Sequence, residues 1–306
     1  MTYDIIIIGG GPAGLTAGLY ASRSMMKTLL LEKVAPGGLA ATTEAVENYP
    51  GFPEAINGYE LVSRMEAQAR KFGLEIISKG ITGISAEGDL FIVRTASAEY
   101  RAYAVIIASG SAARNIGTAN EDRFRGRGVS YCATCDAPFF RDKDVVVVGG
   151  GDTAVEEALY LTKFVSRIYL VHRRDKLRAT PIIQKRALAN PKIQFCWNSV
   201  VEEISGTERL EGVKIKNTVT GEITALAAQG IFVFIGWIPN TAFLKGFVEL
   251  DQSGYILADS EMRTSRKGVY ACGDVVKKNL RQIVNACGEG ATAAFNAQHY
   301  VEELKD

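Results

Sequence analysis

Short, wholly apolar runs mark the predicted strands of this chain. Ile5 to Ile8 and Val145 to Val148 are each followed at once by three glycines and then by a segment of mixed polarity. Apolar runs of roughly four to eight residues that end in glycine are typical of strands buried in a sheet. Each region is therefore predicted to form a strand, a tight turn and a helix.

The same pattern predicts how each sheet is completed. Ala104 to Ala108 is expected to be a late strand of the first unit, and Ile231 to Ile235 its counterpart in the second. A further piece follows, Gly268 to Asp274 and then a predicted helix from about Ile283 to Glu303. This piece is too short to form a domain of its own. We expect it to return to the first sheet.

The sequence thus predicts an α/β fold with two Rossmann-like, three-layer ββα dinucleotide-binding domains. Residues 115–241 form the second domain, which is inserted into a discontinuous first domain made of residues 1–114 and 242–306. Pro239 fits the return crossing between them.

Composition is that of an ordinary enzyme with two cores. The chain has 306 residues, of which 47% are hydrophobic, and a net charge of +1. This charge gives no reason to expect nucleic acid or an acidic membrane surface as a partner. The uncharged stretch Ile223 to Leu244 is long enough to span a bilayer. Glycine, proline and polar residues interrupt it, so we expect a buried strand with its exit turn.

The two glycine-rich segments are matched dinucleotide fingerprints. Leu19-Tyr20 recurs as Leu159-Tyr160 with the spacing that separates Gly9 from Gly149. The first glycine makes the turn, the second lets the backbone approach a pyrophosphate, and the third position allows close helix packing. The phosphates would lie at the positive helix N-terminus. The full segments are Gly9-Gly10-Gly11-Pro12-Ala13-Gly14 and Gly149-Gly150-Gly151-Asp152-Thr153-Ala154.

The residues after the second strand of each unit separate the two ligands. Glu32 ends the first such strand, and its carboxylate can accept hydrogen bonds from ribose hydroxyls. The matching position in the second unit is His172, followed by Arg173, Arg174 and then Arg178. Guanidinium groups can bind a 2′-phosphate that a carboxylate would repel, so the second site favours NADPH over NADH. The other interpretation is a solvated basic turn.

The chain has five cysteines, an odd number, and the N-terminus lacks a signal peptide pattern. This predicts a reducing, cytoplasmic location. Cys132 and Cys135 form a C-x-x-C motif upstream of the second fingerprint, which indicates redox activity. Zinc is the alternative, but a structural zinc site needs four ligands and the chain has one such pair, so we expect no metal. Isolated in sequence, the other three cysteines are expected to be small buried hydrophobes: Cys196, Cys272 and Cys287.

Across essentially its full length the chain resembles the low-molecular-weight, bacterial-type thioredoxin reductases. The motifs that carry the resemblance are the two fingerprints, the C-x-x-C pair with Asp136, and the basic turn. Four further segments match: Val46 to Gly51, Gly149 to Glu157, Ala271 to Val275 and Arg281-Gln282.

The resemblance implies FAD in the first, discontinuous domain and NADPH in the inserted domain. It also implies thioredoxin as the disulfide substrate and a homodimer as the assembly. The FAD residues would be Gly9, Gly11, Pro12, Ala13, Gly14, Glu32, Gly38, Leu39, Asn48, Ala108, Gly110, Gly273, Asp274, Arg281 and Gln282. The NADPH residues would be Gly149, Gly151, Asp152, Thr153, Ala154, Glu156, His172, Arg173, Arg174 and Arg178.

Two of these expectations have a physical reason beside the resemblance. Asp274 follows a strand end, where it can bind a ribityl hydroxyl; the alternative is a simple turn residue. The helix that begins near Gln282 would point its positive N-terminus at the flavin and stabilise its reduced form.

The implied reaction passes electrons from NADPH through the flavin to the Cys132–Cys135 disulfide and on to thioredoxin. In the family the second cysteine, here Cys135, faces the flavin, and Cys132 attacks the protein substrate. Asp136 is the candidate acid or base, since neither histidine adjoins the dithiol. Its alternative role is to cap a helix. The resemblance further implies that the inserted domain rotates, so that dithiol and nicotinamide reach the flavin in turn.

The chain departs from the family at two places. Family members commonly have Gly-Gly-Gln where this chain has Gly37-Gly38-Leu39, and leucine cannot supply the hydrogen bonds of an amide. The segment from Asn115 to Glu121 lacks the proline often found there, which predicts a local change at the interdomain crossing.

Two other functions stay open at this stage. One is a flavin disulfide reductase that takes electrons from ferredoxin or reduces another disulfide. The altered motif Gly37-Gly38-Leu39 is compatible with this function, whereas the arginines that follow His172 argue against a ferredoxin donor. The other is a redox sensor that binds nucleotides and uses the dithiol as a switch.

Overall fold

The computed structural model describes residues 2–43, 46 and 48–306, except for the side chains of Thr134 and Cys135. The chain divides into two compact units, Met1–Ala112 with Ile238–Asp306, and Ala113–Trp237. Both boundaries fall a few residues earlier than the sequence predicted. The two crossings pair with each other as β7 (Ser111–Ala113) and β16 (Trp237–Pro239).

The first unit is built on a sheet with the strand order β3-β2-β1-β6-β5-β4. Strands β1, β2, β3 and β6 are parallel, and β17 adds to β6 in the same direction. The late segment of the chain thus returns to the first sheet, as predicted. The strands are β1 (Thr2–Ile8), β2 (Thr28–Glu32), β3 (Glu75–Ser78), β4 (Ile81–Glu87), β5 (Leu90–Thr95), β6 (Glu99–Ile107) and β17 (Val269–Ala271).

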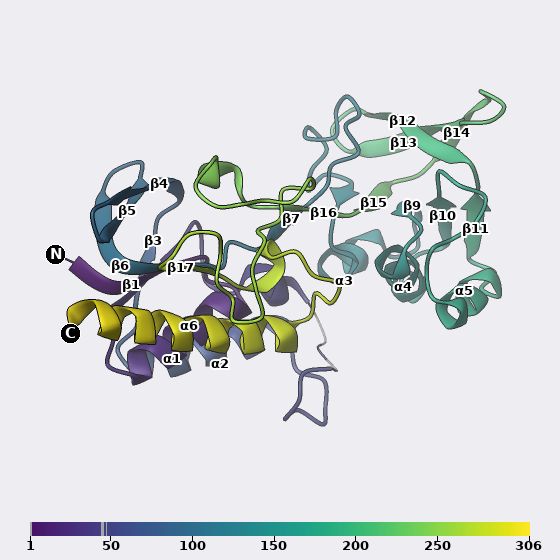
Figure 1. Ribbon diagram of the computed structural model, residues 1–306. Helices are drawn as coiled ribbons and strands as arrows, with labels where there is room; N and C mark the ends of the chain where they lie inside the picture. The colour runs from purple at the N-terminus through teal and green to yellow at the C-terminus, as the bar shows by residue number, and fades with distance from the viewer. Residues whose placement is uncertain (1, 44–45, 47) are drawn as a thin grey trace. The chain divides into compact units, whose positions relative to one another are not determined.

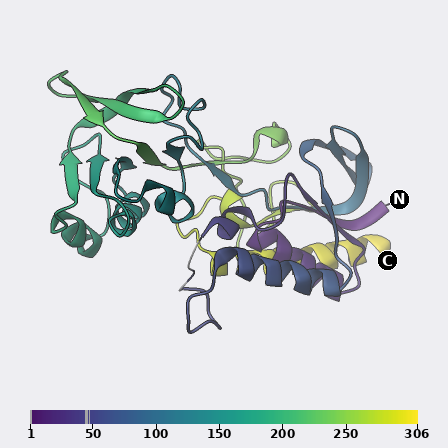
Figure 2. The ribbon, with the colours of Figure 1, turned by 180° about the vertical axis from the view of Figure 1, so that it is seen from behind.

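Successive side chains along a strand point to opposite faces of the sheet, and both faces of this sheet are covered, so the first unit has three layers. Ile5 and Ile7 face one core, which α1 (Pro12–Arg23), α2 (Gly58–Lys71) and α6 (Ile283–Lys305) complete. Ile6 and Ile8 face a second core, shared with β5 and with the segment from Leu244 to Ile256. The three helices lie together on one face of the sheet (Figures 1 and 2). Both faces are buried, which is why β1 is a continuous apolar run.

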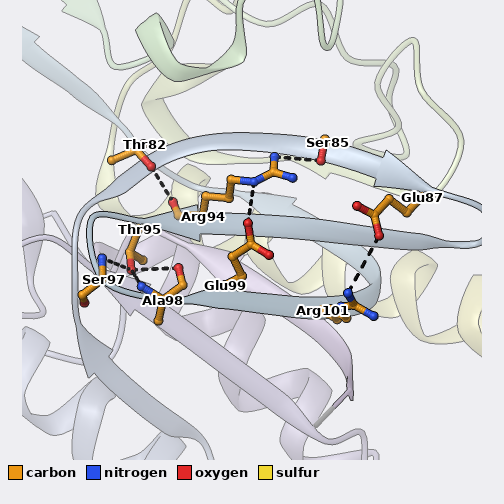
Figure 3. A network of polar contacts seen from close by, with 9 residues as sticks. All are labelled: Thr82, Ser85, Glu87, Arg94, Thr95, Ser97, Ala98, Glu99 and Arg101. Atoms are coloured by element: carbon orange, nitrogen blue, oxygen red, sulfur yellow. Dashed lines mark hydrogen bonds and ion pairs between the residues drawn. The ribbon is translucent and has the colours of Figure 1, made fainter.

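The antiparallel strands β4 and β5 form the third layer, and β6 joins them to the parallel strands of the sheet. Phe91 and Val93 of β5 point into the second core. On these strands Arg94 donates to Glu99 (2.8 Å) and to Ser85 (2.8 Å), so one side chain links three strands (Figure 3). Such exposed pairs add little stability, but they keep this face polar while the other face is buried.

The second unit repeats the plan around the sheet β11-β10-β9-β15-β8. Val145 and Val147 face a core with α4 (Asp152–Leu161) and α5 (Pro181–Leu188), while Val146 and Val148 face the antiparallel sheet β12-β13-β14. Figure 1 shows the helices and the small sheet on opposite faces of the parallel sheet. The two units confirm the predicted fold class. The strands are β8 (Val129–Ser130), β9 (Asp144–Gly149), β10 (Arg167–Val171), β11 (Ile193–Cys196), β12 (Ser199–Gly206), β13 (Leu210–Asn217), β14 (Ile223–Ala227) and β15 (Gly230–Phe234).

Short helices complete the description. They are η1 (Gly38–Thr42), α3 (Ala133–Asp136), η2 (Ala137–Phe140), η3 (Ala242–Leu244) and η4 (Gly273–Val275). No helix in the described part of the chain is long and apolar enough to cross a membrane. The uncharged stretch Ile223 to Leu244 forms β14, β15, β16 and η3; β15 is the buried strand that the sequence predicted, and the other elements were not predicted.

Candidate functional site: two glycine-rich turns and a disulfide-bonded cysteine

The first fingerprint forms an open hollow at the start of α1. Gly9 has φ +106°, and a Cβ there would lie 2.3 Å from the Ala108 carbonyl oxygen. A Cβ on Gly14 would lie 1.9 Å from the Gly9 oxygen, so only glycine allows the helix to approach. At Gly11, by contrast, the nearest atom is the Cα of Gly38 at 4.0 Å. No side chain caps α1, so the free N–H groups of its first turn can bind phosphate.

Glu32 lies directly behind this turn. Its two oxygens accept hydrogen bonds from the backbone N–H groups of Gly10 (2.7 Å) and Val34 (3.2 Å). A carboxylate has about four acceptor positions. Glu32 can therefore fix the glycine turn and still bind ribose hydroxyls.

The Gly273-Asp274 turn contacts the same helix start. A Cβ on Gly273 would lie 2.8 Å from the Cβ of Ala13, and a Cβ on Gly290 would lie 2.2 Å from the Ala13 oxygen. The structure thus brings two groups of predicted FAD residues together, although they are far apart in the sequence.

Glu289 of α6 holds this turn in place. Its carboxylate accepts the Gly273 N–H (2.7 Å), Lys278 Nζ (2.6 Å) and Asn285 Nδ2 (2.8 Å). Lys278 also lies 3.9 Å from Asp274, whose pKa is raised mainly by burial. Sequence reasoning missed Glu289, Lys278 and Asn285. The four-residue spacing of Asn285 and Glu289 on a helix is the signal that could have suggested their contact.

The start of α6 carries further groups suited to a ligand. Asn48 donates to the side chain of Gln282 (3.0 Å). Gln282 is the N-cap residue of α6, and its side chain makes no capping hydrogen bond. The Arg281 guanidinium lies 4.4 Å over the Tyr255 ring, and its Nε is buried without a hydrogen-bond partner in the described structure. Buried donors normally have a hydrogen-bond acceptor, so an oxygen of a bound ligand would supply the acceptor that Arg281 Nε lacks. These residues fit a large anionic cofactor.

The remaining residues predicted for FAD have simpler surroundings. The Ala108 N–H bonds to the Ile8 oxygen (2.8 Å), and Gly110, at φ +63°, accepts from the Asn240 N–H (3.0 Å). Leu39 is 43% exposed, and its carbonyl oxygen accepts from Thr42 Oγ1. Its side chain therefore offers no hydrogen bond at this position. Glu47, within the Val46 to Gly51 motif, lies outside the described residues.

The second fingerprint has the same construction. A Cβ on Gly149 would lie 2.4 Å from the Phe234 oxygen, whereas a Cβ on Gly151 would meet nothing closer than Arg178 Nη2 at 4.0 Å. The Arg178 N–H bonds to the Gly150 oxygen (2.6 Å), so its guanidinium is held beside the open turn. The structure thus brings Gly151 and Arg178 together.

His172 lies against the backbone of the second glycine turn. Its ring is buried, and a Cβ on Gly150 would lie 2.3 Å from it. The ring Nε2 bonds to the Lys176 carbonyl oxygen (3.0 Å), and burial lowers the pKa of the imidazole, opposed by that bond. The buried ring therefore packs beside the Gly150 backbone and supports the second glycine turn. That His172 belongs to the NADPH site stays a prediction.

The other residues predicted for NADPH surround the turn. Arg173 and Arg174 are exposed, and neither forms an ion pair or side-chain hydrogen bond within the described structure. Asp152 accepts the Thr180 N–H (2.7 Å), which gives it a structural role at the start of α5. Thr153 and Glu156 are exposed, and Ala154 is buried, with its Cβ close to Gly149.

Glu157 is a half-buried carboxyl group that sequence reasoning did not single out. Burial and the neighbouring Glu156 raise its pKa to about 7. Its Oε2 has no hydrogen-bond partner among the described residues. An ionised Glu157 is therefore unfavourable in the folded state.

Cys132 lies between β8 and α3 and carries a disulfide bond. Ser130 Oγ accepts the Cys132 N–H and donates to the Cys132 oxygen, both at 3.1 Å. The Asp136 N–H donates to the same oxygen (3.3 Å). The side chain of Cys135 lies outside the described residues. Asp136 makes no capping hydrogen bond to η2, so its alternative role as that helix's cap has no support.

The other three cysteines are free thiols, but only Cys272 is fully buried. Burial raises its pKa, and burial also raises that of Cys196. Cys196 and Cys287 are half-buried, so the expectation of three buried cysteines was right for one. Cys287 accepts from Tyr49 Oη at 3.8 Å. The described residues contain no group of three or more metal-ligating side chains.

Comparison with known proteins identifies the class. Residues 3–290 match the family described as pyridine nucleotide-disulphide oxidoreductase. The chain is 49% identical over 306 residues to the thioredoxin reductase of Peptoclostridium acidaminophilum, covering 98% of this chain and 97% of that one. It is 48% identical over 305 residues to the thioredoxin reductase of Bacillus subtilis strain 168, covering 99% and 96%. The crystal structure of Lactococcus lactis thioredoxin reductase matches with a TM-score of 0.91 at 46% identity, covering 98% and 99%.

The chain therefore belongs to the pyridine nucleotide-disulphide oxidoreductase family and is an oxidoreductase. Within that family, the relatives that it matches over nearly its whole length are thioredoxin reductases. This confirms the resemblance found in the sequence motifs.

Proposed function

We propose that this protein is an NADPH-dependent thioredoxin reductase with FAD as its resident cofactor. The observation that carries the proposal is the combination, in one chain, of two open glycine turns and a disulfide-bonded cysteine. Bound FAD would relay two electrons from nicotinamide to a disulfide.

The first unit would hold FAD. The α1 N-terminus at Gly11 would bind its pyrophosphate, and Glu32 the ribose of its adenosine. The buried Nε of Arg281 supports this assignment because it lacks an acceptor. Glu289 would keep the Gly273-Asp274 turn against α1, so that Asp274 is oriented toward the cofactor.

The second unit would hold NADPH. Gly151 leaves room for a pyrophosphate, and the Arg178 guanidinium next to it adds a positive charge. The exposed Arg173 and Arg174 would bind the 2′-phosphate.

The disulfide exchange would belong to Cys132 and Cys135. We propose that they form the reducible disulfide, that Cys132 attacks the thioredoxin disulfide, and that Asp136 moves the proton for this exchange. The resemblance also favours a homodimer and a cytoplasmic location.

An anaerobic titration tests the proposed function. NADPH is added to the purified yellow protein while the flavin absorbance is followed, and oxidised thioredoxin is then added. We expect NADPH to bleach the flavin and thioredoxin to restore it, with steady turnover when both are in excess. If reduced ferredoxin bleached the flavin and NADPH did not, the electron donor would be ferredoxin and not NADPH. A single turnover without steady activity would favour the redox sensor.

A further inference from the structure

Glu121 is the one carboxylate among the buried polar residues of the described structure, with an exposed fraction of 3%. Its Oε1 accepts the Ile116 N–H (2.8 Å) and the Tyr131 hydroxyl (2.5 Å), and its Oε2 accepts the Gly117 N–H (2.8 Å). Three donors thus converge on a single buried carboxylate. A buried charge with this many hydrogen bonds is stable only while they persist.

The donors come from two segments that matter for the reaction. Ile116 and Gly117 belong to the loop that follows β7, the first crossing into this unit. This is also the loop that lacks the proline common in the family. Tyr131 is the residue immediately before Cys132. Glu121 therefore connects the start of the unit to the backbone that carries the redox cysteine.

Other contacts hold Tyr131 in the same position. The Arg125 guanidinium lies 4.6 Å over its ring, and Arg125 Nη2 is 3.4 Å from its hydroxyl. Arg125 also donates to Asn115 and to Asp122 (3.2 Å each), so it too reaches the loop after β7. Burial and the bond to Glu121 raise the pKa of Tyr131, so the phenol stays a donor.

We propose that Glu121 is a positioning residue for Cys132. Its carboxylate fixes Tyr131 against the loop of Ile116 and Gly117, and so fixes where the Cys132 sulfur lies relative to the crossing from the first unit. This inference rests on the proposed function for its kinetic consequence, but the placement of Cys132 can be measured separately.

Two variants test the proposal. In Glu121→Gln the amide NH2 would face the Gly117 N–H, so donor opposes donor and that bond is lost. Tyr131→Phe removes only the hydroxyl and keeps the ring beneath Arg125. The matched control is Glu203→Gln, which removes a carboxylate from a surface pair with Lys214 in the same unit.

Three measurements are made on each holoenzyme. They are thioredoxin turnover with NADPH, ferricyanide reduction with NADPH, which needs flavin but no cysteine, and the alkylation rate of Cys132 after reduction with dithiothreitol. We expect Glu121→Gln to lower thioredoxin turnover about tenfold, because small displacements of a reacting group are costly. Ferricyanide reduction should stay within about twofold, and alkylation of Cys132 should rise about threefold as its segment loosens. Tyr131→Phe should change thioredoxin turnover and the alkylation rate of Cys132 in the same directions but by smaller factors. The control Glu203→Gln should change none of the three quantities.

The outcomes separate positioning from general support of the fold. If both activities fell together, or if thioredoxin turnover and alkylation stayed at parental rates, the proposal would be wrong. If Glu121→Gln fails to fold, the same three measurements on Tyr131→Phe test the proposal by the same criteria. If the parental enzyme reduced ferricyanide but not thioredoxin, the proposed function would fail. The alkylation rates of Cys132 would then still test whether Glu121 positions Cys132, because this measurement needs neither NADPH nor thioredoxin.

Discussion

Arg173 and Arg174 are the residues on which we expect coenzyme choice to depend. Both are exposed just after the end of β10, and neither forms an ion pair or side-chain hydrogen bond in the described structure. Replacing both with alanine should raise the KM for NADPH and leave that for NADH nearly unchanged. Loss of a charge-assisted contact costs about 1.5 to 3 kcal/mol, or roughly 10- to 100-fold in kcat/KM.

Steady-state kinetics with both coenzymes checks this prediction, with Arg209→Ala, an exposed arginine of the same unit, as the control. An equal loss with NADPH and NADH would contradict the assignment of the 2′-phosphate to these arginines.

Glu157 makes stability depend on pH. Its pKa is about 7 in the folded protein against an ordinary value of 4.5, so the folded state binds the proton more tightly. The free energy of unfolding should therefore fall as pH rises from about 4.5 to 7, and the loss should be complete above that range. Glu157→Gln removes the titration and should stabilise the protein by about 2 kcal/mol at pH 8, with little change at pH 5.

Thermal unfolding of the two proteins at pH 5 and pH 8 measures this difference. The exposed Glu208 provides the control substitution, Glu208→Gln, which should leave both curves unchanged. A variant that is less stable than the parent at pH 8 would show that the ionised carboxylate is satisfied in solution.

Single residues were predictable where a motif fixes their chemistry. The open positions at Gly11 and Gly151 follow from the fingerprints, because only a residue without Cβ leaves that space. His172 was predicted to belong to the NADPH site, which stays a prediction; its ring is buried while Arg173 and Arg174 are exposed, because a strand end carries side chains to both faces of the sheet. Glu121 and Glu157 have no motif, and their burial depends on contacts between segments that sequence patterns do not reveal.

At the scale of elements, the join between η4 and α6 depends on Glu289. Its Oε2 accepts the Gly273 N–H and Lys278 Nζ, and its Oε1 accepts Asn285 Nδ2, so an amide in its place would turn an NH2 toward one of these donors. Glu289→Gln should therefore loosen the Gly273-Asp274 turn and weaken FAD binding about tenfold, the equivalent of about 1.4 kcal/mol.

Titration of flavin-free protein with FAD, followed by fluorescence, measures this affinity without any turnover. Glu303→Gln, on the exposed side of the same helix, serves as the control. An unchanged FAD affinity in Glu289→Gln would limit Glu289 to the internal stability of the first unit.

Cys132 precedes the short helix α3 and Cys135 lies within it, and we expect the two cysteines to have different roles. Cys132→Ser should retain a long-wavelength charge-transfer absorption between thiolate and flavin, because Cys135 would remain beside the ring, and Cys135→Ser should lack it. Both variants should lose disulfide reductase activity, since each removes one half of the exchanging pair. Near-parental thioredoxin turnover by Cys132→Ser would exclude the dithiol as the relay.

The elements themselves were largely predictable. Buried parallel strands must be apolar on both faces, which makes β1, β2, β9 and β15 visible as continuous runs. The helix that follows Arg281-Gln282 begins at Ile283 as predicted and continues two residues beyond the expected end, to Lys305. The partners of β4, β5, β12, β13 and β14 were not predicted, since antiparallel pairing depends on register between half-exposed strands.

At the scale of the whole molecule, the structure adds the pairing of the two crossings, β7 with β16. Sequence reasoning placed an insertion here because the last strand had to return to the first sheet, and β17 does pair with β6. It could not find the boundaries to the residue, because Gly110, Arg114 and Gly236 are all compatible with turns.

These crossings are the basis of the last prediction. We propose that the unit of residues 113–237 rotates about β7 and β16, so that its dithiol and its bound nicotinamide reach the flavin of the other unit alternately. Such hinge motion typically takes microseconds to milliseconds. A crosslink that holds nicotinamide at the flavin should allow flavin reduction but prevent disulfide turnover. A crosslink that holds the dithiol there should prevent reduction by NADPH. The check is rapid-mixing absorbance on each homogeneously crosslinked enzyme, with the crosslink then cleaved to restore activity; full turnover while crosslinked would rule out the rotation.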